Sequence, residues 1–461
     1  MDHFDMVAIG SGPAGEKAAA QAAYFGHKVA VIDRDSRPGG APVNSGGIPT
    51  KTLREASLYL TGFRRRDVYG VGMGLGAEVL LDRLRSRAAE VQESIGNEVR
   101  RNLDRHGIEL IHGEATLGDG SVEVTLAAGG RRTLTADVIL IATGSRPLRP
   151  PSIPFDDPDV HDSDTILAFD RIPGRMVVVG GGPVGVEYGS MFTALGVEVT
   201  LIDVGDRLVP FMDREISRVL EEALEEEGIN VILGQMGAVE RAEGSLNVSL
   251  EDGVVLETDV VLFAAGRVGN TGELGLEQVG VKTDERGRIL VDEHYETSVP
   301  GIYAAGDVIG PPALASVSTE QGRVAACHAF DIPFKETVDP LAPYGVYSIP
   351  EVGMVGMTED AAAESGIEYE VGRSWFKNNP RSAIAGTSQG LIKLVLDRNN
   401  KRLLGAHVVG DEAAELIHIP QAVIHAGGTI DRFIDSTYNV PTRSEAFKYA
   451  AYDALGRLAG T

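Results

Sequence analysis

The sequence predicts an α/β protein with two parallel-sheet domains and a separate α+β module, and three observations lead to this prediction. First, residues 7–38 and residues 177–208 align without a gap. Second, each copy runs from an apolar strand through a glycine-rich turn and a helical stretch to another apolar strand, which is the pattern of a βαβ unit. Third, the pattern changes after about residue 340 to a hairpin and helices that contain no such turn.

The glycine-rich turn has the form G-x-G-x-x-G in both copies, and each copy ends in an aspartate. These residues are Gly10, Gly12, Gly15 and Asp33 in the first copy and Gly180, Gly182, Gly185 and Asp203 in the second. The first glycine permits a tight turn, the second lets the backbone approach a pyrophosphate, and the third lets the helix pack closely on the strand. The helix N-terminus attracts phosphate, and the aspartate can bind ribose hydroxyl groups. The two copies therefore predict two Rossmann-like domains, each binding a dinucleotide.

Three later apolar runs mark where the chain would rejoin these sheets. They cover residues 137–147, 259–270 and 302–310, and each continues into small residues and glycine. A length of 461 residues suggests about three domains. We expect residues 1–148 and 273–338 to form the first dinucleotide-binding domain, residues 149–272 the second, and residues 339–461 the C-terminal module.

The remaining elements follow from local patterns. We expect two amphipathic helical stretches within residues 53–110. We interpret the basic run at residues 64–66, within this segment, as a solvated helical face. Residues 390–410 predict a hairpin with Asn399 and Asn400 near its turn. Residues 411–428 and 444–458 predict helices.

Composition excludes several classes of function. The formal net charge of −25 disfavours nucleic acid and anionic lipid as partners. Apolar runs such as residues 138–142 are too short to cross a bilayer. No basic segment precedes the first strand, which is expected to begin near residue 4, so a cleaved signal peptide is not expected. We expect a cytoplasmic protein.

The single cysteine and the histidines do not indicate a metal site. Cys327 has no partner for an internal disulfide, and its helical context predicts a buried structural thiol. The spacing of His407, His418 and His425 matches no metal motif, so packing or interface roles are expected for them.

The loop at residues 39–51, GGAPVNSGGIPTK, together with both fingerprints, Gly306-Asp307 and the C-terminal module, resembles the pyridine nucleotide-disulfide oxidoreductases. Within this flavoprotein family the soluble pyridine nucleotide transhydrogenases look most similar, in residues 305–326, 348–359 and 437–455. The resemblance implies FAD at the first fingerprint, NAD or NADP at the second, and a homodimer formed by the C-terminal module. It also implies further FAD contacts from Lys51, Thr143, Gly144, Gly306, Asp307 and Ala315, and nicotinamide contacts from Glu187 and Gly266.

Lys51 and Glu187 are the catalytic candidates. By spacing alone they would be a surface lysine and a glutamate in the first turn of a helix, which the helix dipole favours. The resemblance implies that they form an ion pair beside the reactive nitrogen of the flavin, where a cation stabilises electron density on the reduced ring.

Two departures from the family pattern concern its redox chemistry. Pro42 and Gly47 stand where the family has its redox cysteines, and Val440 stands where it has the histidine that manages thiol protons. Glu445 of the same motif is retained. The resemblance implies that these four residues line a substrate pocket on the second flavin face, with Val440 and Glu445 supplied across a dimer interface.

Without thiols, electrons must leave the reduced flavin directly, and three functions remain open. The first is transhydrogenation, in which a second nicotinamide returns to the same site. The second is reduction of a quinone, a small organic molecule or dioxygen by NADH, with the acceptor either at the nicotinamide site or in the space left by Gly47. The third is a flavoprotein scaffold. Asp203 disfavours the 2′-phosphate of NADPH, and Arg207 is the only basic residue of the segment that follows it, residues 204–207.

Overall fold

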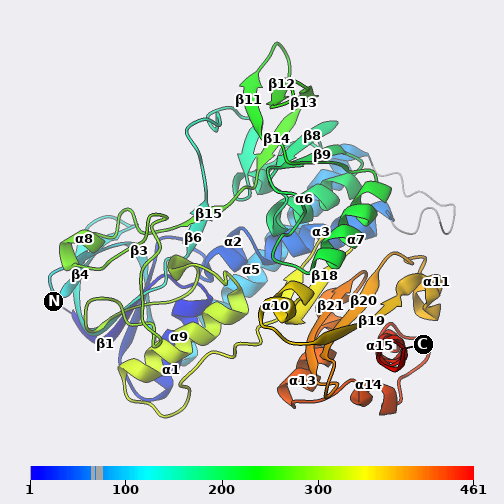
Figure 1. Cartoon of the computed structure of the whole chain (residues 1–461). Helices are drawn as coiled ribbons and strands as arrows, with labels where there is room; N and C mark the ends of the chain where they lie inside the picture. The colour runs from blue at the N-terminus through cyan, green and yellow to red at the C-terminus, as the bar shows by residue number, and fades with distance from the viewer. Residues whose placement is uncertain (1, 64–67, 69–75, 461) are drawn as a thin grey trace. The chain divides into compact units, whose positions relative to one another are not determined.

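The structure is a computed structural model that describes residues 2–63, 68 and 76–460 (Figure 1). The basic run 64–66 lies outside the described residues. The chain groups into two compact units, and each is described by itself. The first contains Met1–Thr52, Arg85–Leu148 and Gly266–Pro340; the second contains Leu53–Leu84, Arg149–Ala265 and Leu341–Thr461. The helices α3 (Ile48–Thr61) and α5 (Ala77–Arg105) contribute residues to both.

The first unit is built on a mixed six-stranded sheet. Its strands are β1 (Asp2–Ile9), β2 (Val29–Asp33), β3 (Glu109–Gly118), β4 (Ser121–Leu126), β5 (Arg131–Ile141) and β16 (Ile302–Ala304). Strand β1 pairs in parallel with β2 and β5, and β16 pairs in parallel with β5. Strand β4 is antiparallel to both β3 and β5. The first strand therefore begins two residues earlier than expected.

Side chains of β1 point alternately to the two faces of this sheet, and both faces are buried. Met6 and Ala8 belong to a core that includes α1 (Pro13–Tyr24) and α9 (Ala315–Ala329), whereas Val7 and Ile9 belong to a core on the opposite face. Residues of β2 and β5 divide between the same two cores. Burial on both faces is typical of parallel strands in doubly wound folds. The unit also contains α2 (Gly40–Asn44), α8 (Leu276–Val279), η2 (Asp307–Ile309), β6 (Ser145–Pro147) and β15 (Arg267–Gly269).

The second unit repeats this architecture and adds the C-terminal sheet. Its parallel sheet has the order β10-β9-β8-β14-β7. These strands are β7 (Val160–Asp162), β8 (Arg175–Val179), β9 (Glu198–Asp203), β10 (Asn230–Leu233) and β14 (Val260–Phe263). The other elements of this part are α6 (Pro183–Ala194), α7 (Arg214–Glu226), η1 (Thr165–Ala168), and the antiparallel strands β11 (Gly237–Arg241), β12 (Leu246–Leu250) and β13 (Val255–Thr258).

The C-terminal sheet is antiparallel, with the order β17-β18-β21-β20-β19. Its strands are β17 (Tyr344–Val346), β18 (Val352–Gly356), β19 (Tyr369–Trp375), β20 (Leu391–Asp397) and β21 (Leu403–Val409). The helices are α10 (Glu359–Glu364), η3 (Phe376–Asn378), α11 (Pro380–Ala385), α12 (Ala413–Leu416), α13 (His418–His425), α14 (Asp431–Asp435) and α15 (Ala446–Ala459). The hairpin predicted at 390–410 is confirmed as β20 and β21.

The helix predicted over 411–428 forms as two helices, α12 and α13, and Pro420 gives the reason. Proline lacks an amide hydrogen and is tolerated only in the first turn of a helix, so α13 begins just before it. The predicted fold class, two Rossmann-like domains followed by an α+β module, is confirmed. Within the described residues, no helix combines the length and apolar composition needed to cross a bilayer.

Candidate dinucleotide-binding sites

The first fingerprint forms the tight turn that its glycines predict. Gly10 follows β1 with φ of +104°, and its amide donates to the carbonyl of Ile32 on β2 (2.7 Å). A Cβ atom at Gly10 would collide with the carbonyl of Ala142, and one at Gly15 would collide with the carbonyl of Gly10. Only glycine fits at either position, because helix α1 and strand β5 approach the turn too closely for a side chain.

The second fingerprint repeats this geometry in the second unit. Gly180 has φ of +121°, and its amide donates to the carbonyl of Ile202 on β9 (2.8 Å). A Cβ atom at Gly180 would lie 2.8 Å from the carbonyl oxygen of Ala264, and one at Gly185 would collide with the carbonyl of Gly180. The sequence repeat is therefore a repeat of backbone geometry.

The two aspartates accept equivalent hydrogen bonds. Asp33 accepts from the amide of Ser11 (2.7 Å) and the amide of Asp35 (2.8 Å), and also from the hydroxyl of Ser11. Asp203 accepts from the amides of Gly181 (2.5 Å) and Gly205 (2.6 Å). Each carboxylate is thus held against its fingerprint turn, and a carboxylate has room for about four hydrogen bonds. The hydroxyl of Ser11 has no counterpart at Gly181 and is a functional contact that the spacing did not predict.

Both fingerprint helices present an anion-binding N-terminus. In α1 and in α6 a proline follows the capping glycine, and no side chain caps either helix within the described residues. The first-turn amides have no acceptor within their own helix. A Cβ atom at Gly182 would have no neighbour within 4 Å, and one at Gly12 would have only the Cα of Gly40 at 3.8 Å. These two cradles fit the pyrophosphates of two dinucleotides.

Asp307 and Gly306 lie where a second segment returns to the first sheet. Gly306 follows β16 with φ of +84°, and its amide donates to Oε1 of the buried Gln321 on α9 (2.9 Å). Asp307 begins η2 and accepts a hydrogen bond from the hydroxyl of Ser145 (3.0 Å). Ala315 is the first residue of α9. Gly306 thus joins the turn after β16 to α9, while FAD contacts from Asp307 and Ala315 stay a prediction.

Thr143, Gly144 and Gly266 border a short two-stranded ribbon formed by β6 and β15. Thr143 Oγ1 donates to the carbonyl of Asn270 (2.8 Å), and Asn270 Nδ2 donates to the carbonyl of Thr143 (2.9 Å). The carbonyl of Gly266 accepts from the amide of Leu148 (3.0 Å). Gly266 belongs to the first unit, so its predicted contact with the second dinucleotide stays a prediction. Asn270 was not predicted, although it ends the run at 259–270.

The loop at residues 39–51 contains no thiol, and its backbone folds closely around Gly47. Pro42 lies in the short helix α2, and a Cβ atom at Gly47 would lie only 2.7 Å from the Cα of Pro42. The carbonyl of Gly47 accepts from Thr50 Oγ1 (2.8 Å) and from the amide of Lys51 (3.2 Å). A side chain at position 47 would therefore meet the backbone of Pro42. Binding of an electron acceptor in the space left by Gly47, and a substrate pocket lined by Pro42 and Gly47, stay predictions.

Lys51 and Glu187 lie in different units. Lys51 is half-buried in the first turn of α3, one turn after Gly47. Glu187 is half-buried on α6, and its Oε1 accepts a hydrogen bond from the amide of Tyr347 (2.9 Å). The ion pair between Lys51 and Glu187 stays a prediction. The contact with Tyr347 was not predicted, because it joins segments 160 residues apart.

Val440 and Glu445 differ sharply in exposure. Val440 is 71% exposed, whereas Glu445 is 6% exposed and is the N-cap residue that precedes α15. Among the described atoms, Glu445 Oε1 has no hydrogen-bond partner. A buried carboxylate oxygen without a donor is rare in proteins. Val440, which stands at the position of a histidine in the family pattern, has an apolar side chain that cannot donate a hydrogen bond. Their place in a substrate pocket remains a prediction.

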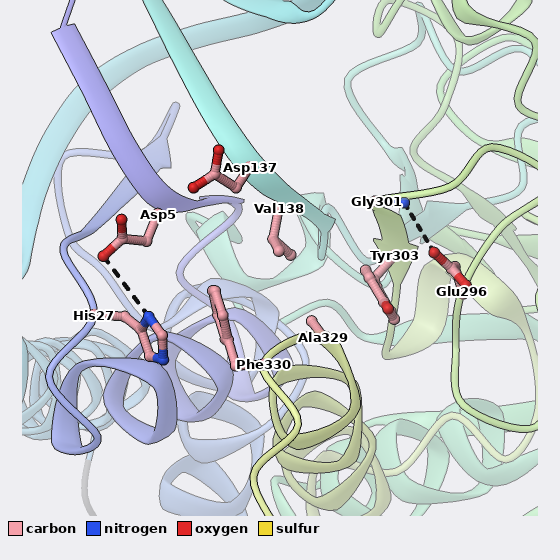
Figure 2. A pocket seen from close by; sticks show the side chains of 9 residues that line it. All are labelled: Asp5, His27, Asp137, Val138, Glu296, Gly301, Tyr303, Ala329 and Phe330. Carbon is pink, nitrogen blue, oxygen red and sulfur yellow. Dashed lines mark hydrogen bonds and ion pairs between the residues drawn. The ribbon is translucent and has the colours of Figure 1, made fainter.

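A hollow of about 520 Å³ in the first unit contains none of the predicted site residues (Figure 2). It opens near the N-terminal ends of the parallel strands, away from the fingerprint turns that follow their C-terminal ends. His27 stacks on Phe330 beside it, and Glu296 accepts from the amide of Gly301 (2.8 Å). Its lining residues are Asp5, His27, Asp137, Val138, Glu296, Gly301, Tyr303, Ala329 and Phe330.

Cys327 and His407 are both buried. Burial raises the pKa of the Cys327 thiol, which disfavours the reactive thiolate. Burial lowers the pKa of His407, and its Nε2 lies 3.0 Å from the carbonyl of Met357. His418 and His425 are exposed on α13. Two described groups bring carboxylate or imidazole atoms within 4.8 Å of one another: His3, Asp5 and Asp137, and Asp213, Glu215 and Glu359.

Comparison with known proteins identifies the family. Residues 4–322 match the pyridine nucleotide-disulphide oxidoreductase family, and residues 342–451 match its dimerisation domain. The chain belongs to the pyridine nucleotide-disulphide oxidoreductase family. The predicted FAD-dependent oxidoreductase, with FAD and NAD(P)H as its cofactors and a C-terminal dimerisation module, is thereby confirmed. In this member of the family, the loop at residues 39–51 contains no cysteine.

Relatives match over the whole chain. The chain is 41% identical over 461 residues to a soluble pyridine nucleotide transhydrogenase of Mycobacterium tuberculosis, covering 99% of this chain and 98% of the relative. It is 39% identical over 463 residues to the Pseudomonas aeruginosa protein of that name, covering 99% of each. Among solved structures, the flavoprotein disulfide reductase RclA of Escherichia coli is similar, with 28% identity and a TM-score of 0.88 over 97% of this chain and 99% of that chain. LpdA of M. tuberculosis matches with 28% identity and a TM-score of 0.88 over 98% and 99%.

Proposed function

We propose that this protein is a transhydrogenase that exchanges hydride between NADPH and NAD⁺ without a redox disulfide. The observation that carries this proposal is full-length identity of 39–41% to soluble pyridine nucleotide transhydrogenases, combined with a loop that holds Pro42 and Gly47. FAD, when bound, supplies the chemistry by accepting a hydride from one nicotinamide and yielding it to another. The word soluble in the relatives' names supports a cytoplasmic location.

The residues of this chain supply binding and electrostatics. In the first unit, the fingerprint turn, the first turn of α1 and Asp33 would hold FAD. In the second, the first turn of α6 and Asp203 would hold the nicotinamide dinucleotide. We propose that Lys51 stabilises negative charge on the reduced ring, with Glu187 holding its ammonium group in place.

We also propose that the electron acceptor binds at the nicotinamide site. Pro42 and Gly47 stand in place of both redox cysteines, and no described cysteine other than the buried Cys327 could relay electrons. An acceptor must then use the place that the first nicotinamide leaves, so the kinetics should be ping-pong. The dimerisation domain supports a homodimer, in which we expect Val440 and Glu445 to border the site of the partner subunit.

One observation favours a second function, reduction of a small acceptor by NADH alone. Asp203 is fixed by two backbone amides, so its charge stands where a 2′-phosphate would lie. The nearest basic candidate, Arg207, donates through Nη2 to the carbonyl of Pro210 (2.7 Å). NADPH must overcome this repulsion, or Arg207 must leave Pro210 to bind the phosphate.

Anaerobic reduction of the purified flavoprotein separates the two functions. Under the proposed function, NADPH and NADH both bleach the flavin absorbance, and NAD⁺ restores it after reduction by NADPH. Rapid bleaching by NADH together with none by NADPH would assign the second function. A flavin that neither nucleotide bleaches would overturn both.

A further inference from the structure

Lys393 is a fully buried lysine surrounded by three carboxylates. It lies on β20 in the C-terminal sheet, and none of its side chain is exposed. Its Nζ lies 2.6 Å from Asp213, 3.0 Å from Glu215 and 2.5 Å from Glu359. Asp213 and Glu215 stand at the start of α7 in the second Rossmann-like domain, so one ammonium group joins this domain to the C-terminal sheet within the second unit.

The cluster keeps its charges. Burial by itself would lower the pKa of Lys393, but hydrogen bonds and charge from Asp213 and Glu359 raise it above its usual value. Arg373 on β19 adds a second cation, at 2.7 Å from Glu215. Lys393 and Arg373 therefore offset two of the three negative charges of this acidic group. Removing the ammonium would leave buried carboxylates uncompensated, which proteins tolerate poorly.

Asp213 ends the loop that connects the second fingerprint to α7. This loop, residues 204–213, begins directly after Asp203. Asp213 caps α7 by accepting a hydrogen bond from the amide of Glu215 (3.0 Å). Its carboxylate therefore has three tasks: it caps the helix, binds Lys393, and accepts a hydrogen bond from the amide of Glu359 (3.2 Å).

The middle of the loop is held against the fingerprint. Val209 is buried with φ of +41°, and its amide donates to the carbonyl of Gly181 (2.8 Å). The carbonyl of Val209 accepts from the amide of Met212 (2.9 Å) and from Ser217 Oγ (3.4 Å). A left-handed backbone at valine is costly and persists only where the surroundings determine it. Two of its partners, Met212 and Ser217, lie on either side of Asp213 in the sequence.

We propose that Lys393 is a positioning residue for the nicotinamide dinucleotide. By holding Asp213, it keeps the loop at 204–213 in the conformation that presents Asp203 and Gly181 to the dinucleotide. The proposal rests on the function proposed above only in assigning the nicotinamide dinucleotide to the second fingerprint. It makes the C-terminal sheet, which contains no fingerprint, a determinant of nicotinamide affinity.

A matched ion pair distinguishes positioning from simple stabilisation. Arg214 and Asp360 join the same two helices, α7 and α10, at 2.8 Å, but their side chains are 64% and 48% exposed. Neither residue belongs to the loop. A substitution at Asp360 would weaken the contact between α7 and α10, as a substitution at Lys393 or Asp213 would. Only a substitution at Lys393 or Asp213 would also release the loop at 204–213.

The test measures NADH binding through rapid anaerobic flavin reduction at a series of NADH concentrations. Lys393→Met and Asp213→Asn should each raise the NADH concentration that gives half-maximal rate about tenfold, as network substitutions do. The maximal rate and the FAD content should stay within about twofold of the wild type, because the FAD-binding residues are untouched. Asp360→Asn should leave all three quantities unchanged.

Two outcomes overturn the proposal. One is an unchanged half-saturating concentration in both variants; the other is a rise of the same size in Asp360→Asn. If Lys393→Met does not fold, Asp213→Asn still decides, since asparagine caps helices as well as aspartate does. A wild-type protein whose flavin neither NADH nor NADPH reduces would instead overturn the proposed function.

Discussion

At the scale of single residues, Asp33 and Asp203 show what spacing predicts and what it leaves out. Their distance from the fingerprint glycines predicted a carboxylate at each ribose. The structure adds that each carboxylate is bonded to the backbone of its own turn, at Ser11 and at Gly181. Those bonds depend on the turn conformation, which no side-chain pattern encodes.

We predict that Asp203→Asn relaxes the preference between the two nicotinamides. The amide keeps an acceptor oxygen for Gly181 or Gly205 but removes the charge that repels a 2′-phosphate. The ratio of kcat/KM for NADPH to that for NADH should rise about tenfold, which steady-state reduction assays can measure.

Asp33→Asn is the matched control, because Asp33 has the same backbone contacts in the other fingerprint. It should lower the FAD content of the purified protein and leave the NADPH to NADH ratio unchanged. If Asp33→Asn changed this ratio and Asp203→Asn did not, the two cofactors would be assigned to the wrong fingerprints.

The contact between Gly47 and Pro42 leads to a second prediction at this scale. Gly47→Ala should lower the melting temperature, because its Cβ would lie 2.7 Å from the Cα of Pro42. Overpacking of this kind costs about 1–3 kcal/mol. Gly46→Ala, one residue earlier, meets nothing within 4 Å and should have little effect. Equal melting temperatures for the two variants would show that the loop accommodates a side chain at Gly47.

Cys327 provides a third prediction. It is buried, and its pKa is raised by burial, so it does not form a reactive thiolate. Thiol reagents such as N-ethylmaleimide should leave hydride exchange between nicotinamides unchanged in the folded protein, and Cys327→Ser should retain it. Loss of activity on alkylation, prevented by Cys327→Ser, would reveal a thiol in the reaction.

At the scale of elements, the βαβ units and the hairpin were predictable because their periodicity is local. Strands β1, β2, β8 and β9 follow from apolar runs, and α1 and α6 follow from the fingerprints. The cluster around Lys393 was not predictable. A lysine in a hairpin strand is typical of a solvent-exposed face, whereas Lys393 lies in a strand that is buried on both faces, and its carboxylate partners lie 34 to 180 residues away.

This cluster should make the thermal stability of the protein decrease at acidic pH. Burial by itself would raise the pKa of Glu215, but the hydrogen bond from Arg373 and the charge of Lys393 lower it below its usual 4.5. Its contribution to stability is complete above the unfolded pKa and is lost as pH falls through the lower folded value. The melting temperature should therefore fall as pH decreases from about 5 to about 3.

Glu215→Gln should flatten this acid dependence. Glu222→Gln, which changes an exposed glutamate on the same helix, should leave it as steep as in the wild type. Equally steep curves for the wild type and Glu215→Gln would mean that the cluster does not contribute to acid stability.

At the scale of the whole molecule, the sequence predicted two dinucleotide sites and a third module. It did not predict that residues 149–265 and 341–461 share one compact unit, because the contacts that join them, such as Lys393 to Asp213, are remote in sequence. The departure from the family pattern was visible directly, since Pro42, Gly47 and Val440 are read from the sequence. Only the structure shows that the backbone of Pro42 lies close to Gly47 and that, among the described atoms, Glu445 Oε1 has no hydrogen-bond partner.

The central claim is that hydride passes between nicotinamides through FAD with no second redox centre. An anaerobic titration with NADPH, followed by NAD⁺, tests it most directly by counting electrons per FAD. The account predicts that two electrons enter for each FAD and that about one NADH forms for each FAD when NAD⁺ is added. Four electrons for each FAD, or reduced enzyme that NAD⁺ does not reoxidise, would contradict it.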